Sequence, residues 1–433
     1  MTYEPTSRDA VRSLIWRVTT YGQDRDGRRL VAIIVSAYYA LVGLPPLAGL
    51  PNVWPSIGVP AAPAPFFDTR VLTAAIECRR LGFDPLINNP CDPAGRPLNY
   101  PRAWLLLRWI GLTHAHTELL ALIFIVLFVA AFFLLVGRIS RGEGILVAIA
   151  LCSPSVMLGI ERGNTDIVVF SLVAFAMVLW RNRVKQFEIL SPLVVFAAAI
   201  LKLFPVLGLP AFLFVRRRTA AIAALAVAAA FAVYTFVFKD DLAAIMRGTP
   251  QGTENAYGAR ILPAAIYHRF VADRWHTAVI KQMVALVPVL LGLPVIWVFG
   301  RRRRRTRDQG ASSWRRLAFF AGSFVFLGTF MIGNNWDYRL VFLLLTLPQL
   351  FAWIADPTAD PRATLAAYTL VSILVDLWIG AFARPLALAD ELATWALVGL
   401  LVALLAASLP PFRFVGPRVH NSWIAIRMSG PRL

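Results

Sequence analysis

Long apolar runs separated by short polar clusters recur along the whole chain. A helix of about 17 to 25 mostly apolar residues is long enough to cross a bilayer. We expect spans near residues 30–50, 118–136, 144–160, 166–180, 219–238, 278–300, 317–333, 339–355, 363–382 and 391–409. The pattern therefore predicts an all-α polytopic membrane protein.

The segment 189–215 departs from this pattern, because its apolar run is too long for one ordinary span and too short for two. Lys202 and Pro205 interrupt its middle, and both of its flanks are basic. Two short half-helices with Lys202 at their tip would keep both flanks on one side of the membrane. A single helix kinked at Pro205, with Lys202 reaching to the interface, is the alternative. Counting the hairpin as two segments gives about twelve in all.

The basic residues indicate the orientation of the spans. The chain is 58% hydrophobic and only 15% charged, yet its net charge is +19. The Arg residues stand in short clusters between apolar runs, which is typical of cytoplasmic loops and not of a nucleic-acid-binding surface. We therefore expect a lipid bilayer and no nucleic acid as partner, cytoplasmic termini, and the run "RRRRRTR" (301–307) in the cytoplasm. The first thirty residues are polar and Arg-rich, so no cleavable signal peptide is expected.

With this orientation, residues 1–433 form a single integral membrane domain with two long segments at the outer face, 51–117 and 239–276. Cys78 and Cys91 both fall in the first of them, on the oxidising side, and predict a disulfide. His114 and His116 have no further ligand at a metal-binding spacing, so we expect no metal site there.

Polar side chains gather where the spans reach the outer face. Ionisable groups at membrane depth are costly and usually pair or line a site. Any single one could be an interfacial cap or ion pair, such as Glu161 with Arg162 or Asp337 with Arg339. Separate clusters converging on one face predict a functional site. Its candidate residues are Glu161, Arg162, Asn164, Asp166, Lys202, Asn334, Asn335, Asp337 and Arg339.

Asp68 lies in the first outer segment, at the start of a predicted helix. It is either the N-cap of that helix or a general base over an outer-face cavity. Asp84 and Asp92, in "FDP" and "CDP", are typical of turns.

The polar clusters fit more than one class of protein. Broken helices with charged tips also form the substrate sites of secondary transporters and lipid flippases. Such proteins usually carry an internal repeat, and neither "ERGNTD" nor "KLFP" recurs in the other half of the chain. An assembly factor would explain the hydrophobicity but not the polar clusters. No Gly-rich phosphate loop follows a predicted strand, which argues against a nucleotide-sugar donor.

An ordered set of short motifs resembles glycosyltransferase family 87. After Asp68 come "GFDP", "NYPRAW", "ERGNTDIVVF", "ILKLFPVLGLPAFLF" and "NNWDYRLVFLL", between about residues 66 and 345. The resemblance implies a GT-C fold and a hexosyltransferase. It also implies transfer of mannose, as in the best-known members, from a polyprenyl-phosphate donor to an envelope glycan or glycolipid. The expected location is a bacterial cytoplasmic membrane, with the active site facing outside.

The resemblance also suggests roles for single residues. Asp68 would be the catalytic base, and one displacement without a covalent intermediate would invert the anomeric carbon. Arg162, Asn164, Asp166 and Lys202 match positions near the family's site. Because a departing phosphate needs cations to stabilise it, we also expect Arg162, Lys202 and Arg339 to bind the donor phosphate. Arg102 replaces a proline found in many relatives, which leaves the acceptor open. No cofactor is implied, and a role for a divalent metal is left open. The other site-lining candidates are Glu161, Asn164, Asp166, Tyr100, Arg102, Tyr257, Asn335 and Asp337.

Overall fold

The computed structural model describes residues 27–182, 184–215, 217–250, 255–261, 313–333, 335–355 and 362–408. In this part of the chain, 7 helices are long and apolar enough to cross a membrane, or up to 8 if a bent pair counts as one span. The protein is thus a mostly helical, multi-pass membrane protein. Six of these spans correspond to α2 (Gly27–Leu47), α4 (Thr117–Val136), α9 (Arg218–Val237), α13 (Ser313–Ile332), α15 (Ala363–Ile379) and α16 (Ala383–Ser408), and the seventh is Asp337–Ile354. The α7 helix (Thr165–Arg181) is slightly shorter, with 17 residues.

Most of the predicted spans coincide with helices of the structure. The span expected at 339–355 is formed by η5 (Asp337–Thr346) and α14 (Leu347–Ile354), and 83% of its apolar window is buried. By contrast, only 17% of the α9 window is buried, so most of that helix faces outward. The expected span 278–300 and the run 301–307 lie outside the described residues, as do both termini. The count of twelve and the GT-C fold stay predictions.

The span expected at 144–160 is broken, which the hydropathy pattern did not predict. It consists of α5 (Arg141–Leu151) and α6 (Pro154–Arg162), bent by 53°. Pro154 occupies the start of α6, and the Ser153 hydroxyl accepts a hydrogen bond from the Val156 amide at 3.5 Å. Proline at the first helical position and serine at the N-cap start a new helix instead of continuing the old one.

The segment 189–215 also consists of two short pieces, as the broken-hairpin hypothesis predicts. The α8 helix (Phe187–Leu201) ends immediately before Lys202, whose backbone is extended, with φ −161° and ψ 113°. The tight helix η4 (Phe204–Phe214) follows and packs against α8. A single kinked helix therefore does not describe this segment, and Lys202 stands at the break.

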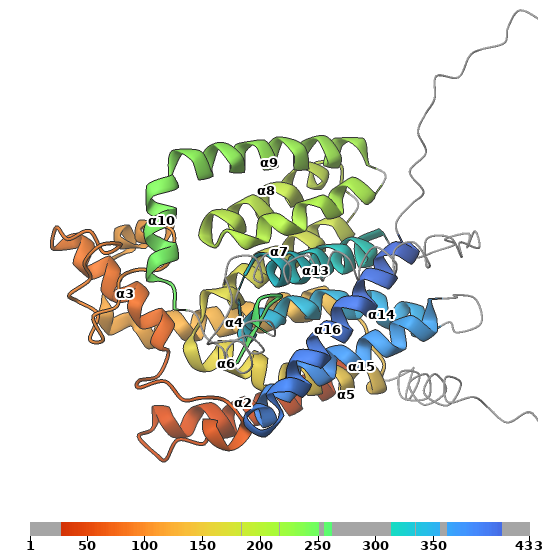
Figure 1. Cartoon of the computed structure of the whole chain (residues 1–433), viewed down its shortest axis with the longest axis horizontal. Helices are drawn as coiled ribbons and strands as arrows, with labels where there is room; N and C mark the ends of the chain where they lie inside the picture. Colours follow the sequence, from red (N-terminus) through yellow and green to blue (C-terminus); the bar gives the residue numbers. More distant parts are fainter. Residues whose placement is uncertain are drawn as a thin grey trace, which may run out of the picture.

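Helices from the two long polar segments lie at one end of the helix bundle. Figure 1 shows α3 (Phe67–Arg80), from residues 51–117, at the left end of the molecule with α10 (Lys239–Gly248), from residues 239–276. Strands β1 (Ala256–Tyr257) and β2 (Asn335–Trp336) pair antiparallel and tie the second segment to the start of η5. The remaining short helices are η1 (Trp54–Ile57), η2 (Arg102–Ile110), η3 (His114–His116) and η6 (Gly380–Phe382).

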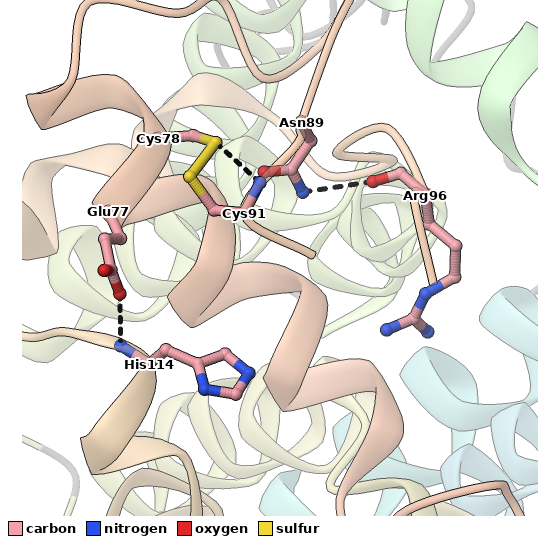
Figure 2. The surroundings of a disulfide bond; sticks show 6 residues. All are labelled: Glu77, Cys78, Asn89, Cys91, Arg96 and His114. Atoms are coloured by element: carbon pink, nitrogen blue, oxygen red, sulfur yellow. Dashed lines mark hydrogen bonds between the residues drawn. A yellow bond between two sulfur atoms is a disulfide. The ribbon is translucent and has the colours of Figure 1, made fainter. Parts of the chain in front are cut away.

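A disulfide between Cys78 and Cys91 closes a loop in the first polar segment, which confirms the prediction. Its Cα atoms are 5.6 Å apart. Neighbouring hydrogen bonds brace the loop: Asn89 donates to the Arg96 carbonyl at 3.0 Å, and the His114 amide donates to Glu77 at 3.1 Å (Figure 2). The third cysteine, Cys152, is a buried free thiol.

We expect the Cys78→Ser/Cys91→Ser double variant to lose about 3 kcal/mol of stability, because a cross-link between residues 13 positions apart removes conformational freedom from the unfolded chain. Thermal unfolding of the detergent-solubilised protein, with and without reductant, measures the loss. Reductant should destabilise the wild type and leave the double variant unchanged. An equal response of both proteins would contradict the prediction.

Candidate active site

The first polar segment is fastened to the end of α6. The Phe66 amide donates to the Glu161 carbonyl at 3.1 Å, and the Ala62 amide donates to the Glu161 carboxylate at 2.7 Å. Phe66 is the N-cap of α3 and has a left-handed backbone, with no side-chain capping bond. Asp68 stands in the first turn of α3 and caps nothing. The N-cap hypothesis for Asp68 is therefore wrong, and the residue is partly exposed.

A tight turn between α6 and α7 holds Asp68 in place. Gly163 has φ +57° and ends α6, and its carbonyl accepts a hydrogen bond from the Thr69 hydroxyl at 2.6 Å. Asn164 caps α7 by accepting from the Asp166 amide at 2.8 Å. Its side-chain amide donates to the Asp68 carboxylate at 2.5 Å. One asparagine thus starts a helix and orients the candidate base.

From Asn164, a chain of polar contacts crosses to the other helices. Lys202 Nζ donates to Asn164 Oδ1 at 3.0 Å and to Thr165 Oγ1 at 3.2 Å, and it forms an ion pair with Asp166. Arg339 Nε lies 3.1 Å from the other oxygen of Asp166, and its Nη1 donates to Asn335. We call this series the polar chain: Asp68, Asn164, Lys202, Asp166, Arg339 and Asn335.

The polar chain is largely shielded from solvent. The Asp166 side chain is 0% exposed, while those of Lys202 and Arg339 are 13% and 16% exposed. Two cations therefore share one buried carboxylate, and the second carboxylate of the polar chain, Asp68, reaches Lys202 only through Asn164. The cationic part of this low-dielectric site is partly open. Such a site attracts an anion.

Three aromatic rings border the cations. Lys202 Nζ lies 5.1 Å from the centre of the Tyr100 ring and 5.6 Å from that of Tyr338, and the Arg339 guanidinium lies 4.3 Å from that of Phe204. Burial raises the pKa of the Tyr100 phenol well above its usual value, so this ring stays neutral. Sequence reasoning missed Tyr338 and Phe204, although both stand within two residues of a predicted cation.

Arg102 lies apart from the polar chain. Its guanidinium donates to both oxygens of Asp84, at 2.9 and 2.8 Å, and to Asp241 of α10 at 2.7 Å. Hydrogen bonds from Arg102 lower the pKa of Asp84. Asp84 also accepts from the Leu86 amide at 3.3 Å, in the turn that the sequence predicts. We call the group Arg102, Asp84 and Asp241 the Arg102 clasp.

The remaining candidates surround the polar chain without joining it. Asp337 forms no pair with Arg339, contrary to one interpretation of the sequence, and instead lines a small crevice with Ser155 and Gly380. Glu161 and Arg162 do pair, at 3.1 Å. Tyr257 supports Asn335 through Thr329, whose hydroxyl contacts Tyr257 at 2.8 Å and whose carbonyl accepts from Asn335 at 2.7 Å. Asn334 lies outside the described residues.

We expect Gly163→Ala to destabilise the turn below Asp68. The left-handed backbone would cost about 1 to 3 kcal/mol with a side chain. The new Cβ would also lie 2.4 Å from the Thr69 hydroxyl oxygen, which would force α3 away from the turn between α6 and α7. The midpoint of thermal unfolding should fall. Gly95→Ala is the matched control, because Gly95 has φ +65° but open space around it. Equal losses in both variants would show that the Thr69 contact does not matter.

Comparison with known proteins gives one match. A family model described as glycosyltransferase family 87 matches residues 99–327, which is more than half of the chain. The matched region includes Asn164, Asp166 and Lys202, whereas Asp68 and Arg339 lie on either side of it. Searches of curated proteins and of solved structures found no match. With its membrane-spanning helices and this match, the chain belongs to glycosyltransferase family 87.

Proposed function

We propose that the protein transfers a sugar, with mannose as the first candidate, from a polyprenyl-phosphate donor to an envelope glycan or glycolipid. The observation that carries the proposal is the polar chain, because it connects a partly exposed carboxylate with two partly exposed cations around Asp166. A reaction that moves a sugar from a phosphate to a hydroxyl needs a base and an anion-binding group close together.

In this reaction, Asp68 removes the proton from the acceptor hydroxyl as its oxygen bonds to the anomeric carbon. The bond from that carbon to the phosphate oxygen breaks at the same time, and the configuration of the anomeric carbon is inverted. Lys202 and Arg339 stabilise the negative charge on the departing lipid phosphate. Arg162 is a further candidate for the phosphate, although it is paired with Glu161. Tyr100, Tyr257, Asn335 and Asp337 would line the substrate site.

The distribution of basic residues supports an active site at the outer face of the membrane, which we take to be a bacterial cytoplasmic membrane. The polar chain joins the starts of α3, α7 and η5 and the end of α8. At the ends of α4 and α7, Arg181 donates to the Leu134 carbonyl at 3.1 Å and lies over the Trp314 ring. Arg clusters at that opposite end are expected in the cytoplasm. Cytoplasmic termini and a GT-C fold are part of the proposal.

Transfer of radiolabelled mannose from synthetic polyprenyl-phosphate-mannose, by purified protein in nanodiscs, tests this function. Membrane extracts supply the acceptors, and protein-free nanodiscs are the control. A labelled product that forms only with protein supports the transferase. If no product forms and wild-type protein instead moves the lipid-linked sugar across liposome bilayers, the protein is a flippase. If neither process occurs, the donor assignment is wrong.

A further inference from the structure

An apolar cavity of about 280 Å³ lies between η2, the end of α8, the end of α9 and α10. Hydrocarbon side chains, including Ile200, Leu242 and Ile245, form most of its wall. The charged groups in the wall, Arg102 and Asp241, already neutralise each other at 2.7 Å. A cavity with this lining suits an apolar group and offers little to a sugar.

Two stretches of chain connect the cavity with the polar chain. Ile200 lines the cavity, and Lys202 follows it by two residues, at most about 7 Å away along the backbone. Pro101 also lines the cavity and directly follows Tyr100, whose ring borders Lys202. A molecule with a hydrocarbon chain in the cavity could therefore have a polar group beside Lys202.

The surfaces on either side of the cavity are apolar and exposed. Near the end of α9, Phe236 is 76% exposed, and on η2, Trp109 and Ile110 are 75% and 71% exposed. The η2 helix ends shortly before α4 begins, so these side chains lie near the predicted membrane boundary. Exposed aromatic and aliphatic side chains at that depth contact lipid. The cavity thus lies beside lipid on one side and beside Lys202 on the other.

We propose that this cavity holds the part of the donor's polyprenyl chain next to the phosphate. The chain enters sideways from the lipid between η2 and α9, while the phosphate lies at Lys202. This inference rests on the proposed function, which places the donor phosphate at Lys202. The acceptor is the less suitable occupant, because its reacting hydroxyl has to reach Asp68, which stands on α3 and does not line the cavity.

The Arg102 clasp holds the walls of the cavity together. Arg102 belongs to η2 and Asp241 to α10, so their ion pair spans the cavity from one wall to the other. The same guanidinium also forms an ion pair with Asp84, with Arg102 Nη2 at 2.8 Å from Asp84 Oδ2. Arg102 therefore acts in this proposal as a positioning residue that maintains the shape of the chain-binding cavity.

The test compares two donors that differ only in their lipid: polyprenyl-phosphate-mannose and ethyl-phosphate-mannose. We expect the wild type to have a much lower KM for the polyprenyl donor. Leu242→Trp fills the cavity and should raise the KM for that donor about tenfold or more, while the KM for the ethyl donor should change far less. Met246→Trp is the matched control, because Met246 stands one turn along α10, is 73% exposed and does not line the cavity.

A second measurement needs no catalysis. A polyprenyl phosphate with a photoreactive group near its phosphate should cross-link to the peptide that contains Leu242, and unlabelled polyprenyl phosphate should compete where excess phospholipid does not. If phospholipid competes equally, the cavity holds ordinary acyl chains and the inference is wrong. Ile245→Trp replaces Leu242→Trp if the latter does not fold. If both Trp variants transfer sugar from the polyprenyl donor as fast as the wild type, the cavity assignment is wrong. If the wild type transfers sugar from neither donor, the proposed function is wrong.

Discussion

Asp68→Asn should lower the transfer rate by about two to four orders of magnitude, the usual contribution of a general base. An asparagine has nearly the same shape and still accepts the hydrogen bond that Asn164 donates at 2.5 Å. The variant should therefore fold and bind the donor as the wild type does, while it lacks a group that can remove the acceptor's proton. Transfer of radiolabelled mannose in nanodiscs measures the rate, and thermal unfolding checks the fold.

Asp240→Asn is the control for this experiment. Asp240 is an exposed carboxylate on α10, in the second polar segment, and its removal changes the net charge equally without touching the polar chain. Its transfer rate should stay near that of the wild type. Near-wild-type turnover by Asp68→Asn would exclude Asp68 as the base. A loss in both variants would mean that surface charge, and not proton removal, determines the rate.

Several features of the fold could be predicted from the amino-acid sequence alone. Spans such as α4 and α9 were predictable because apolar length alone decides whether a helix can cross a bilayer. The disulfide was predictable because Cys78 and Cys91 share one short segment. The break at Lys202 was predictable because a charge and a proline interrupt the apolar run. The break at Pro154 was missed because the span was predicted from apolar length alone, although Ser153 followed by Pro154 is itself a helix-start signal.

The residues of the candidate site were predictable from the sequence, but the ion pairs that they form were not. The charge pattern placed Asp166, Lys202 and Arg339 at one face, and the structure brings them into contact. Neighbours in sequence suggested that Asp337 pairs with Arg339. In a tight helix such as η5, side chains two apart point in different directions, so Arg339 turns to Asp166 and Asp337 does not. The Arg102 clasp joins three distant stretches, and no local pattern could have indicated it.

The same physics explains why the polar chain is costly to maintain. Removing charges from water costs several kcal/mol for each ion, and their attraction offsets this cost only when the geometry is good. Asp166 satisfies two cations at once, and the Asn164 and Asn335 side chains complete their hydrogen bonds. Such a costly buried cluster is best explained by a function. The polar chain keeps two partly exposed cations, Lys202 and Arg339, in position to bind an anion.

Asp166→Asn should destabilise the protein by about 3 to 5 kcal/mol, because it leaves Lys202 and Arg339 close together without their buried counter-charge. Thermal unfolding in detergent measures the loss. Adding Lys202→Met should restore part of the stability, since one of the two uncompensated charges is then gone. Asp241→Asn, which breaks the more exposed Arg102 pair, should cost only about 1 kcal/mol or less.

The stabilisation of Asp166→Asn by an anionic lipid shows whether the polar chain binds substrate or only supports the fold. If Lys202 and Arg339 bind the donor phosphate, polyprenyl phosphate should stabilise Asp166→Asn at least as strongly as the wild type, because both cations are then free to bind it. The same lipid should stabilise Asp166→Asn/Lys202→Met much less. Stabilisation that is equal in all three proteins would place the phosphate elsewhere, and Arg162 beside Glu161 would become the first alternative.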